Sequence, residues 1–218
     1  MKSLYILGAG GFGREVYDWI RDALDFQNEY RFTGFLDDNQ EALKDFDLDA
    51  SVRPLKEYRY REGDCLICGI GNPQLKYKIC QPLVEAGAEF LTVIHPSAKV
   101  GSRSEIGMGS VICPQVVITC DVRIGAFVLI NLTSTVGHDA RIGDWSTISA
   151  HCDITGSVQL GTSVFLGSGA RVIPEKRVGD SATLGAGAVV IRDVSSGCSV
   201  FGNPARTIFS SASSQINA

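Results

Sequence analysis

The sequence predicts two joined domains of different class: an α/β domain with a parallel sheet over residues 1–92, and an all-β parallel solenoid over residues 93–209. The solenoid is predicted by a strict period of six: every sixth residue from Ile94 to Val190 is Ile, Leu or Val, seventeen positions in succession. The α/β domain is predicted by a strand, a glycine turn and a helix at the start of the chain, followed by further strands and helices. Residues 210–218 are polar, and we expect them to form a flexible tail.

The period of six fits neither a helical stripe nor a simple alternating strand. The position four residues after each aliphatic is also restricted: except at Lys176 it is Ala, Ser, Cys or Val. Both features fit a triangular coil in which each hexad forms one face, the aliphatic points inward and the small residue fills the corner. Three hexads complete one coil, so residues 18 apart are stacked and bury a continuous aliphatic column.

The glycine turn after the first strand is a candidate phosphate site. Gly8, Gly10 and Gly13 complete a GxGxxG pattern in "YILGAGGFGREV". Glycines let the backbone approach a phosphate, and the N-terminus of the following helix favours an anion. The alternative is a tight strand-to-helix turn that binds nothing.

Acidic and polar residues end the next predicted strands. Asp37 and Asp38 follow "YRFTGFL", where a carboxylate can accept a hydrogen bond from a ribose or a base. Gly71 and Asn72 stand between the buried strand "DCLICGI" and the next helix. About ninety residues make only about half of a doubly wound fold, so a mononucleotide or a nucleotide-sugar suits this domain better than a dinucleotide.

Composition excludes several classes of function. The net charge is −4 and no basic run stands out, which argues against nucleic-acid binding. No apolar run approaches the 18–20 residues of a membrane span, and the first strand does not resemble a signal peptide, so we expect a cytoplasmic protein. The seven cysteines lack a disulfide framework, and Cys65 and Cys68 form a single CxxC in a buried strand. We therefore expect free buried thiols and no metal site.

Six motifs together resemble one family over nearly the whole chain: "GAGGFGREV", "FLDD", "GIGNP", "HPSA", "VGHDARIGD" and "FGNPARTI". They are similar to the bacterial sugar acetyltransferases of the PglD, PerB and NeuD type. The resemblance implies a Rossmann-like N-terminal domain and a left-handed parallel β-helix of hexapeptide repeats, assembled as a homotrimer with sites between subunits. It also implies acetyl-CoA as the donor and no required metal.

Three histidines are candidates for the general base of such a reaction. An attacking amine or hydroxyl must lose a proton, and histidine titrates near neutral pH. The resemblance implies that His138 is the base and that Asp139 orients its imidazole. His95 lies at the entry to the first coil and is expected to be structural, and His151 is a weaker candidate. The alternative for His138 is an exposed histidine on a turn.

The resemblance also implies two sets of binding residues. The nucleotide-sugar would contact Gly8, Gly10, Gly11, Phe12, Gly13, Asp37, Asp38, Gly71, Asn72 and Asn131. Coenzyme A would contact Thr147, Gly167, Ser168, Gly185, Ala186, Asn203, Pro204 and Arg206. Many members have His where this chain has Phe12, and simple turn chemistry is the alternative for each glycine.

The expected function is acetyl-CoA-dependent N-acetylation of a UDP-, GDP- or dTDP-linked amino sugar, by direct attack, for surface glycans such as lipopolysaccharide O-antigen. The nearest alternative is O-acetylation of a sialic-acid-type sugar, which uses the same base and donor. Two others are an NAD(P)-dependent oxidoreductase, which would leave the solenoid unexplained, and a structural trimer without activity.

Overall fold

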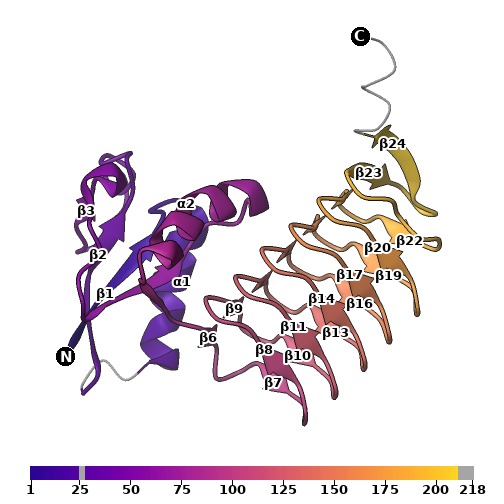
Figure 1. Cartoon of the computed structure of the whole chain (residues 1–218), viewed down its shortest axis with the longest axis horizontal. Helices are drawn as coiled ribbons and strands as arrows, with labels where there is room; N and C mark the ends of the chain where they lie inside the picture. The colour runs from indigo at the N-terminus through magenta and orange to yellow at the C-terminus, as the bar shows by residue number, and fades with distance from the viewer. Residues whose placement is uncertain (25–27, 211–218) are drawn as a thin grey trace.

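The computed structural model describes residues 1–24 and 28–210, and shows an α/β region beside a parallel β-solenoid (Figure 1). Apart from Ser210, which ends a strand, the expected tail over 210–218 lies outside the described residues. None of the described helices is long and apolar enough to cross a membrane.

The N-terminal domain is a five-stranded parallel sheet in the order β3-β2-β1-β4-β5, which confirms the predicted α/β class. Its strands are β1 (Lys2–Leu7), β2 (Tyr30–Leu36), β3 (Val52–Arg53), β4 (Asp64–Cys68) and β5 (Glu89–Phe90), with helices α1 (Gly11–Ala23) and α2 (Pro73–Glu85) and the 3₁₀ turn η1 (Leu55–Glu57). Side chains of β1 alternate between the two faces of the sheet. Leu4 and Ile6 share a core with Val16 of α1, whereas Tyr5 and Leu7 pack on the other side.

The solenoid is a three-sided β-helix whose parallel strands stack into three faces (Figure 1). Face 1 holds β6 (Val93–Ile94), β9 (Val111–Ile112), β12 (Leu129–Ile130), β15 (Thr147–Ile148), β18 (Phe165–Leu166) and β21 (Thr183–Leu184). Face 2 holds β7 (Lys99–Val100), β10 (Val117–Ile118), β13 (Thr135–Val136), β16 (Asp153–Ile154), β19 (Arg171–Val172) and β22 (Val189–Val190). Face 3 holds β8 (Glu105–Ile106), β11 (Arg123–Ile124), β14 (Arg141–Ile142), β17 (Gln159–Leu160) and β20 (Arg177–Val178). We name each corner by the faces it joins: edge 1–2, edge 2–3 and edge 3–1.

Stacked residues are 18 apart, as the hexad pattern predicts. Ile118 pairs with Val136, and Val136 with Ile154, and all three are buried. The aliphatic column is exposed only at its first coil, where Ile94 and Val100 are each 40% exposed. No earlier coil covers them there.

The corners differ from a simple glycine turn. The third residue after most of the repeat aliphatics is in the left-handed region, and in most corners it is not glycine; Asp139 and His151 both have φ of 60°. That conformation is costly for residues with a Cβ. The N–H groups of both residues donate to a carbonyl of the preceding coil, that of Asp139 to Cys120 and that of His151 to Leu132. Each corner is therefore fastened to the coil beneath it.

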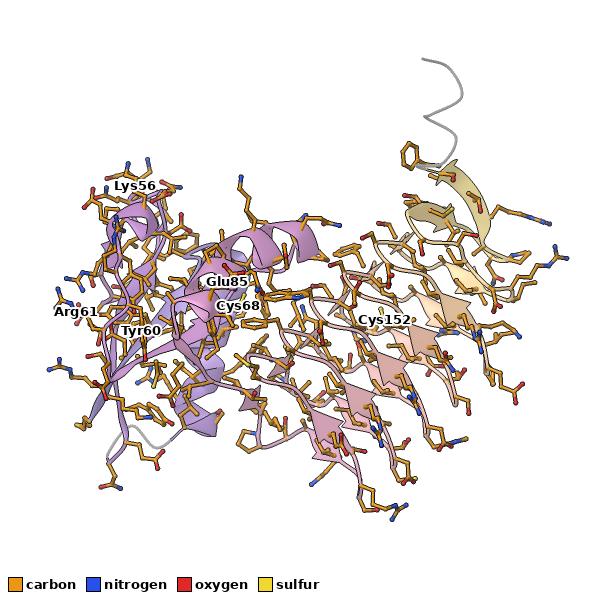
Figure 2. The ribbon with its side chains drawn as sticks, viewed as in Figure 1. Lys56, Tyr60, Arg61, Cys68, Glu85 and Cys152 are labelled. Atoms are coloured by element: carbon orange, nitrogen blue, oxygen red, sulfur yellow. The ribbon has the colours of Figure 1, made fainter. Side chains whose placement is uncertain are left out.

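An antiparallel hairpin closes the C-terminal end of the β-helix. It consists of β23 (Cys198–Phe201), which pairs with β21, and β24 (Arg206–Ser210). All seven cysteines are free; Cys65 and Cys68 are buried in β4, as expected, whereas Cys120 is partly exposed. Figure 2 shows Cys68 near the boundary of the two domains and Cys152 within the β-helix.

Helix α2 fixes the N-terminal domain on face 1 of the β-helix. The Nζ of Lys76, only 2% exposed, donates to the Ser146 carbonyl at 3.2 Å and to Thr147 Oγ1 at 3.1 Å. Burial lowers the pKa of Lys76 to about 8. Rings add to the contact at edge 3–1, where Phe127 and Trp145 are stacked 4.2 Å apart and Tyr77 of α2 meets Trp145 edge-on.

Candidate active site

His138 stands exposed on edge 2–3, two residues after β13. A hydrogen bond of 2.8 Å joins its Nδ1 to Oδ2 of Asp139, and the histidine side chain is 65% exposed. An ionised carboxylate can only accept, so Nδ1 carries the proton and Nε2 of the neutral ring presents its lone pair outward. The arrangement can therefore remove a proton from a nucleophile that approaches Nε2.

Gly156 lies against the imidazole of His138, at the same corner of the next coil. A Cβ at Gly156 would stand 2.7 Å from Nε2 and 2.8 Å from Cε1 of His138. Those separations are shorter than van der Waals contact, so the ring can occupy this position only because residue 156 has no side chain. Our reading of the sequence missed Gly156, although its spacing of 18 from His138 is a signal that could have found it.

A second carboxylate, Asp121, lies one coil before Asp139. Arg103 binds it with two charge-assisted hydrogen bonds, from Nε at 2.6 Å and from Nη2 at 2.7 Å. Those bonds are the main cause that lowers the pKa of Asp121 to about 2, and the nearby His138 contributes. Asp121 is therefore ionised throughout the neutral range, and Arg103 pairs with its charge.

The expected coenzyme positions lie on a different corner of the chain. Ser168 and Ala186, together with the glycines before them, are on edge 1–2, and both side chains are exposed. Gly167 and Gly185 are required by stacking: a Cβ at Gly167 would meet the backbone of Ala186, and one at Gly185 would meet the Phe201 ring. Face 2 separates all of these residues from His138.

Asn131 also lies on edge 1–2, where its Oδ1 accepts a hydrogen bond from the Leu132 N–H at 2.7 Å. Thr147, in contrast, is only 3% exposed beneath α2, and its hydroxyl accepts the Lys76 hydrogen bond. A ligand cannot reach Thr147 while α2 lies on face 1, so we leave it out of the proposed site.

Cations gather at the C-terminal end of the β-helix. Asn203 and Pro204 lie exposed in the turn between β23 and β24, and Arg206 begins β24. Arg206 and Arg192 line a cavity of about 180 Å³. Arg192 stands on edge 2–3, three coils beyond His138, so positive charge lies along the same corner as the histidine.

The glycine turn of the N-terminal domain divides into two parts. Gly8, at φ 92°, and Gly13 pack so closely that a Cβ on Gly13 would meet the Gly8 carbonyl. Gly10 and Gly11 are exposed at the start of α1, and a Cβ on either would meet nothing within 4 Å. The first pair is explained by packing, whereas the second leaves open space at a helix N-terminus, where an anion is favoured. Phe12 beside them is half-buried against Trp19.

The polar residues near this turn also hold the backbone. Asp37 accepts from the N–H groups of Ala9 at 2.8 Å and Asn39 at 2.9 Å, and Asp38 accepts from the Lys56 N–H at 3.0 Å. Each carboxylate keeps lone pairs that a ligand can use.

The residues that follow β4 also hold the backbone and leave open space. Asn72 caps α2 by accepting from the Leu75 N–H at 2.8 Å. Gly71 before it has open space where a Cβ would point.

Comparison with known proteins shows what this chain is similar to. Residues 3–83 match the model of the PglD N-terminal domain. PerB from Caulobacter crescentus, solved in complex with CoA and GDP-perosamine, has a TM-score of 0.84 and 27% identity, and the match covers 96% of this chain and 98% of that one. Over nearly its whole length the chain is similar to proteins of the PglD and PerB type. The likeness confirms the predicted fold, an α/β domain followed by a left-handed parallel β-helix.

Three further proteins are similar to this chain. The acetyltransferase domain of PglB from Neisseria gonorrhoeae, in complex with acetyl coenzyme A, has a TM-score of 0.83 and 28% identity, with 95% of this chain and 99% of that one covered. UDP-N-acetylbacillosamine N-acetyltransferase of Bacillus subtilis is 32% identical over 118 residues, 51% of each chain. GDP-perosamine N-acetyltransferase of Escherichia coli O157:H7 is 30% identical over 133 residues, 59% of each. The chain thus spans between half and three fifths of the curated relatives it matches.

Proposed function

We propose that this protein transfers the acetyl group of acetyl-CoA to the amino group of a nucleotide-linked amino sugar, for surface-glycan assembly. The observation that carries the proposal is the hydrogen-bonded His138–Asp139 pair over Gly156, on the frame of a protein solved with CoA and GDP-perosamine. Among residues 1–24 and 28–210, no cluster of three potential metal ligands is found.

The proposed reaction is a direct transfer. The sugar nitrogen attacks the thioester carbonyl and forms the C–N bond, while Nε2 of His138 takes a proton from that nitrogen. The C–S bond then breaks, and the departing thiolate of coenzyme A receives the proton from the imidazolium. Cys120, one coil before His138, is a poor alternative nucleophile, because hydrogen bonding to Asp121 raises the pKa of its thiol.

We infer that each site is completed by a second copy of the chain. His138 is on edge 2–3, whereas Asn131 and Ser168 are on edge 1–2, across the whole of face 2. Helix α1, which begins at the glycine turn, approaches edge 1–2 through its other end, where Nε2 of His95 is 3.5 Å from Oδ2 of Asp22. A homotrimer in which edge 2–3 of one copy meets edge 1–2 of the next would bring these groups together.

Within that site we place the two substrates as follows. The nucleotide phosphates would bind at Gly10 and Gly11, with the other expected contacts of the N-terminal domain, including Phe12, Asp37, Asp38, Gly71 and Asn72, around the ribose and base. Asn131 would hold the acceptor sugar. The pantetheine arm would run past Ser168 and Ala186, toward Asn203 and Pro204. The guanidinium groups of Arg192 and Arg206 at this end suit the phosphates of coenzyme A.

The substrate proposal is tested by incubating the protein with isotope-labelled acetyl-CoA and a panel of UDP-, GDP- and dTDP-amino sugars and free sialic acids. We expect one nucleotide-linked amino sugar to gain an acetyl group that survives mild alkali, as an amide does. An alkali-labile product on a sialic acid would instead establish O-acetylation. Acetylation of no nucleotide-linked amino sugar would refute the proposal, and tight saturable binding of NAD(P)H would favour an oxidoreductase.

The shared site predicts complementation between two inactive variants. In Gly11→Asp the new carboxylate lies at the N-terminus of α1, where it suits the helix but repels a phosphate. His138→Ala removes the base. Every trimer that contains both variants has one intact site among its three interfaces, so mixed trimers should regain about one third of the wild-type kcat.

The complementation is measured on co-expressed chains carrying two different affinity tags, purified through both. Each variant expressed alone provides the control and should remain inactive. Mixed trimers that stay inactive would show that His138 and the glycine turn of one and the same chain act together.

A further inference from the structure

A cavity of about 340 Å³ opens on the sheet of the N-terminal domain, on the face opposite α1. Its floor includes Tyr5 of β1, and it reaches Ser3 and Asp64 at the amino ends of β1 and β4. The glycine turn follows the carboxyl end of β1, at the opposite end of the strand. Figure 2 shows Arg61, which lines the cavity, on the side of the domain far from the β-helix.

The cavity exists because the sheet is only partly covered. A doubly wound fold has helices on both faces of the sheet. Here α2 packs beside Leu66 and Cys68, whereas β3 and β4 are joined by a segment whose only helical part is η1. That segment, residues 54–63, crosses the face beside Tyr5 in place of a helix and leaves a space beneath it.

Three guanidinium groups line this space. Arg53 donates from Nη1 to the Tyr5 hydroxyl at 3.1 Å, and Arg59 donates from Nη1 to the carbonyls of Lys56 and Tyr58. Within residues 1–24 and 28–210, none of Arg53, Arg59 and Arg61 has a carboxylate oxygen within 4.0 Å. Their positive charges are therefore not neutralised by the protein.

The carboxylates of the cavity offset only part of this charge. Asp64 is buried and accepts a hydrogen bond from the Tyr58 hydroxyl at 2.9 Å, and Glu57 is exposed at the rim. Three cationic side chains face two anionic ones. The rings of Tyr5 and Tyr58, 5.4 Å apart, add an apolar wall.

We propose that this cavity is a second binding site, for a small organic phosphate. A guanidinium group matches the oxygens of a phosphate with two parallel hydrogen bonds, and the unpaired arginines supply the charge that such an anion needs. The volume falls in the range of small-molecule pockets. The site is independent of acetyl transfer, since all of its residues belong to the N-terminal sheet and the segment that crosses it.

Hydrogen bonds connect the cavity to the glycine turn. The Arg53 carbonyl accepts from the Asp37 N–H at 3.0 Å, and Asp37 holds the Ala9 N–H of the turn at 2.8 Å. A phosphate that draws Arg53 into the cavity would therefore act on the residue that shapes the turn.

Calorimetric titration of the full-length protein with inorganic pyrophosphate tests the site. The Gly11→Asp protein serves as the parent, because it disfavours phosphate at the glycine turn, and low ionic strength limits screening. We expect saturable binding that weakens at least about tenfold in Arg61→Ala and Arg53→Ala, since each removes charged hydrogen bonds. Arg31→Ala, an exposed arginine of β2 outside the cavity, is the matched control and should bind as the parent does.

A variant that removes a carboxylate should change the affinity for pyrophosphate in the opposite direction. Glu57→Gln removes a negative charge from the rim, so pyrophosphate should bind more tightly. Arg61 makes no side-chain hydrogen bond or ion pair in the described chain, so Arg61→Ala tests the site even if Arg53→Ala does not fold. The proposal is overturned if pyrophosphate does not bind the parent, or if it binds Arg61→Ala and Glu57→Gln with the affinity of the parent.

Discussion

Replacing His138 with Ala should lower kcat by about 10²- to 10⁴-fold, the usual contribution of a positioned general base. The loss follows from the geometry: Nε2 of His138 points outward while Nδ1 is held by Asp139, and no other histidine lies on edge 2–3. The fold should be unaffected, because the side chain is exposed and fills no part of the core. Steady-state kinetics with the acceptor found in the labelled acetyl-CoA screen measures the change.

His95→Asn is the matched control. His95 is a second histidine at a corner of the β-helix, and its Nδ1 accepts from the Ser97 N–H at 3.1 Å, a role that an amide oxygen can take over. Its kcat should equal that of the wild type. A His138→Ala enzyme that retains wild-type turnover would remove His138 from its proposed role.

The second large effect is expected at Gly156. In Gly156→Ala the new Cβ would overlap Nε2 of His138, so the imidazole must move by several tenths of an ångström or more. A displacement of about 1 Å can cost about 10²-fold in rate, and we expect a loss of that order in kcat with little change in KM for acetyl-CoA. The coil should tolerate the substitution, because Ser102, Cys120 and Pro174 carry side chains at the equivalent position of other coils.

A double variant separates positioning from any other role of Gly156. In a His138→Ala background there is no ring to displace, so adding Gly156→Ala should cause no further loss of activity. If the two losses multiply instead, Gly156 acts independently of the imidazole.

Much of the β-helix could be predicted because its geometry is periodic. Spacing alone places Ser168 above Ala150 and below Ala186, and it also places Asp121 beside Arg103, a pair that we did not foresee although it obeys the same interval of 18. The same period also predicts that Asn131 and His138, which belong to successive hexads, lie on different corners.

The contacts between the domains could not be predicted in this way. Thr147 reads as one more outward residue of a hexad, and only the packing of α2 shows that it is buried under Lys76, 71 positions earlier. The cavity beside Tyr5 depends in the same way on where residues 54–63 cross the sheet. Such contacts involve segments of the N-terminal domain, which do not follow the hexad repeat, so composition and spacing do not predict them.

The interval of 18 also limits how this molecule can change length. Loss or gain of 18 residues within the β-helix removes or adds a whole coil, and every later side chain keeps its corner. A change of six residues turns all later residues by one face, so that Arg192 would no longer share a corner with His138. The C-terminal end of the β-helix, where the donor is proposed to bind, can thus be moved relative to His138 only by whole coils. Such a protein should tolerate insertions and deletions of 18 residues but not those of six.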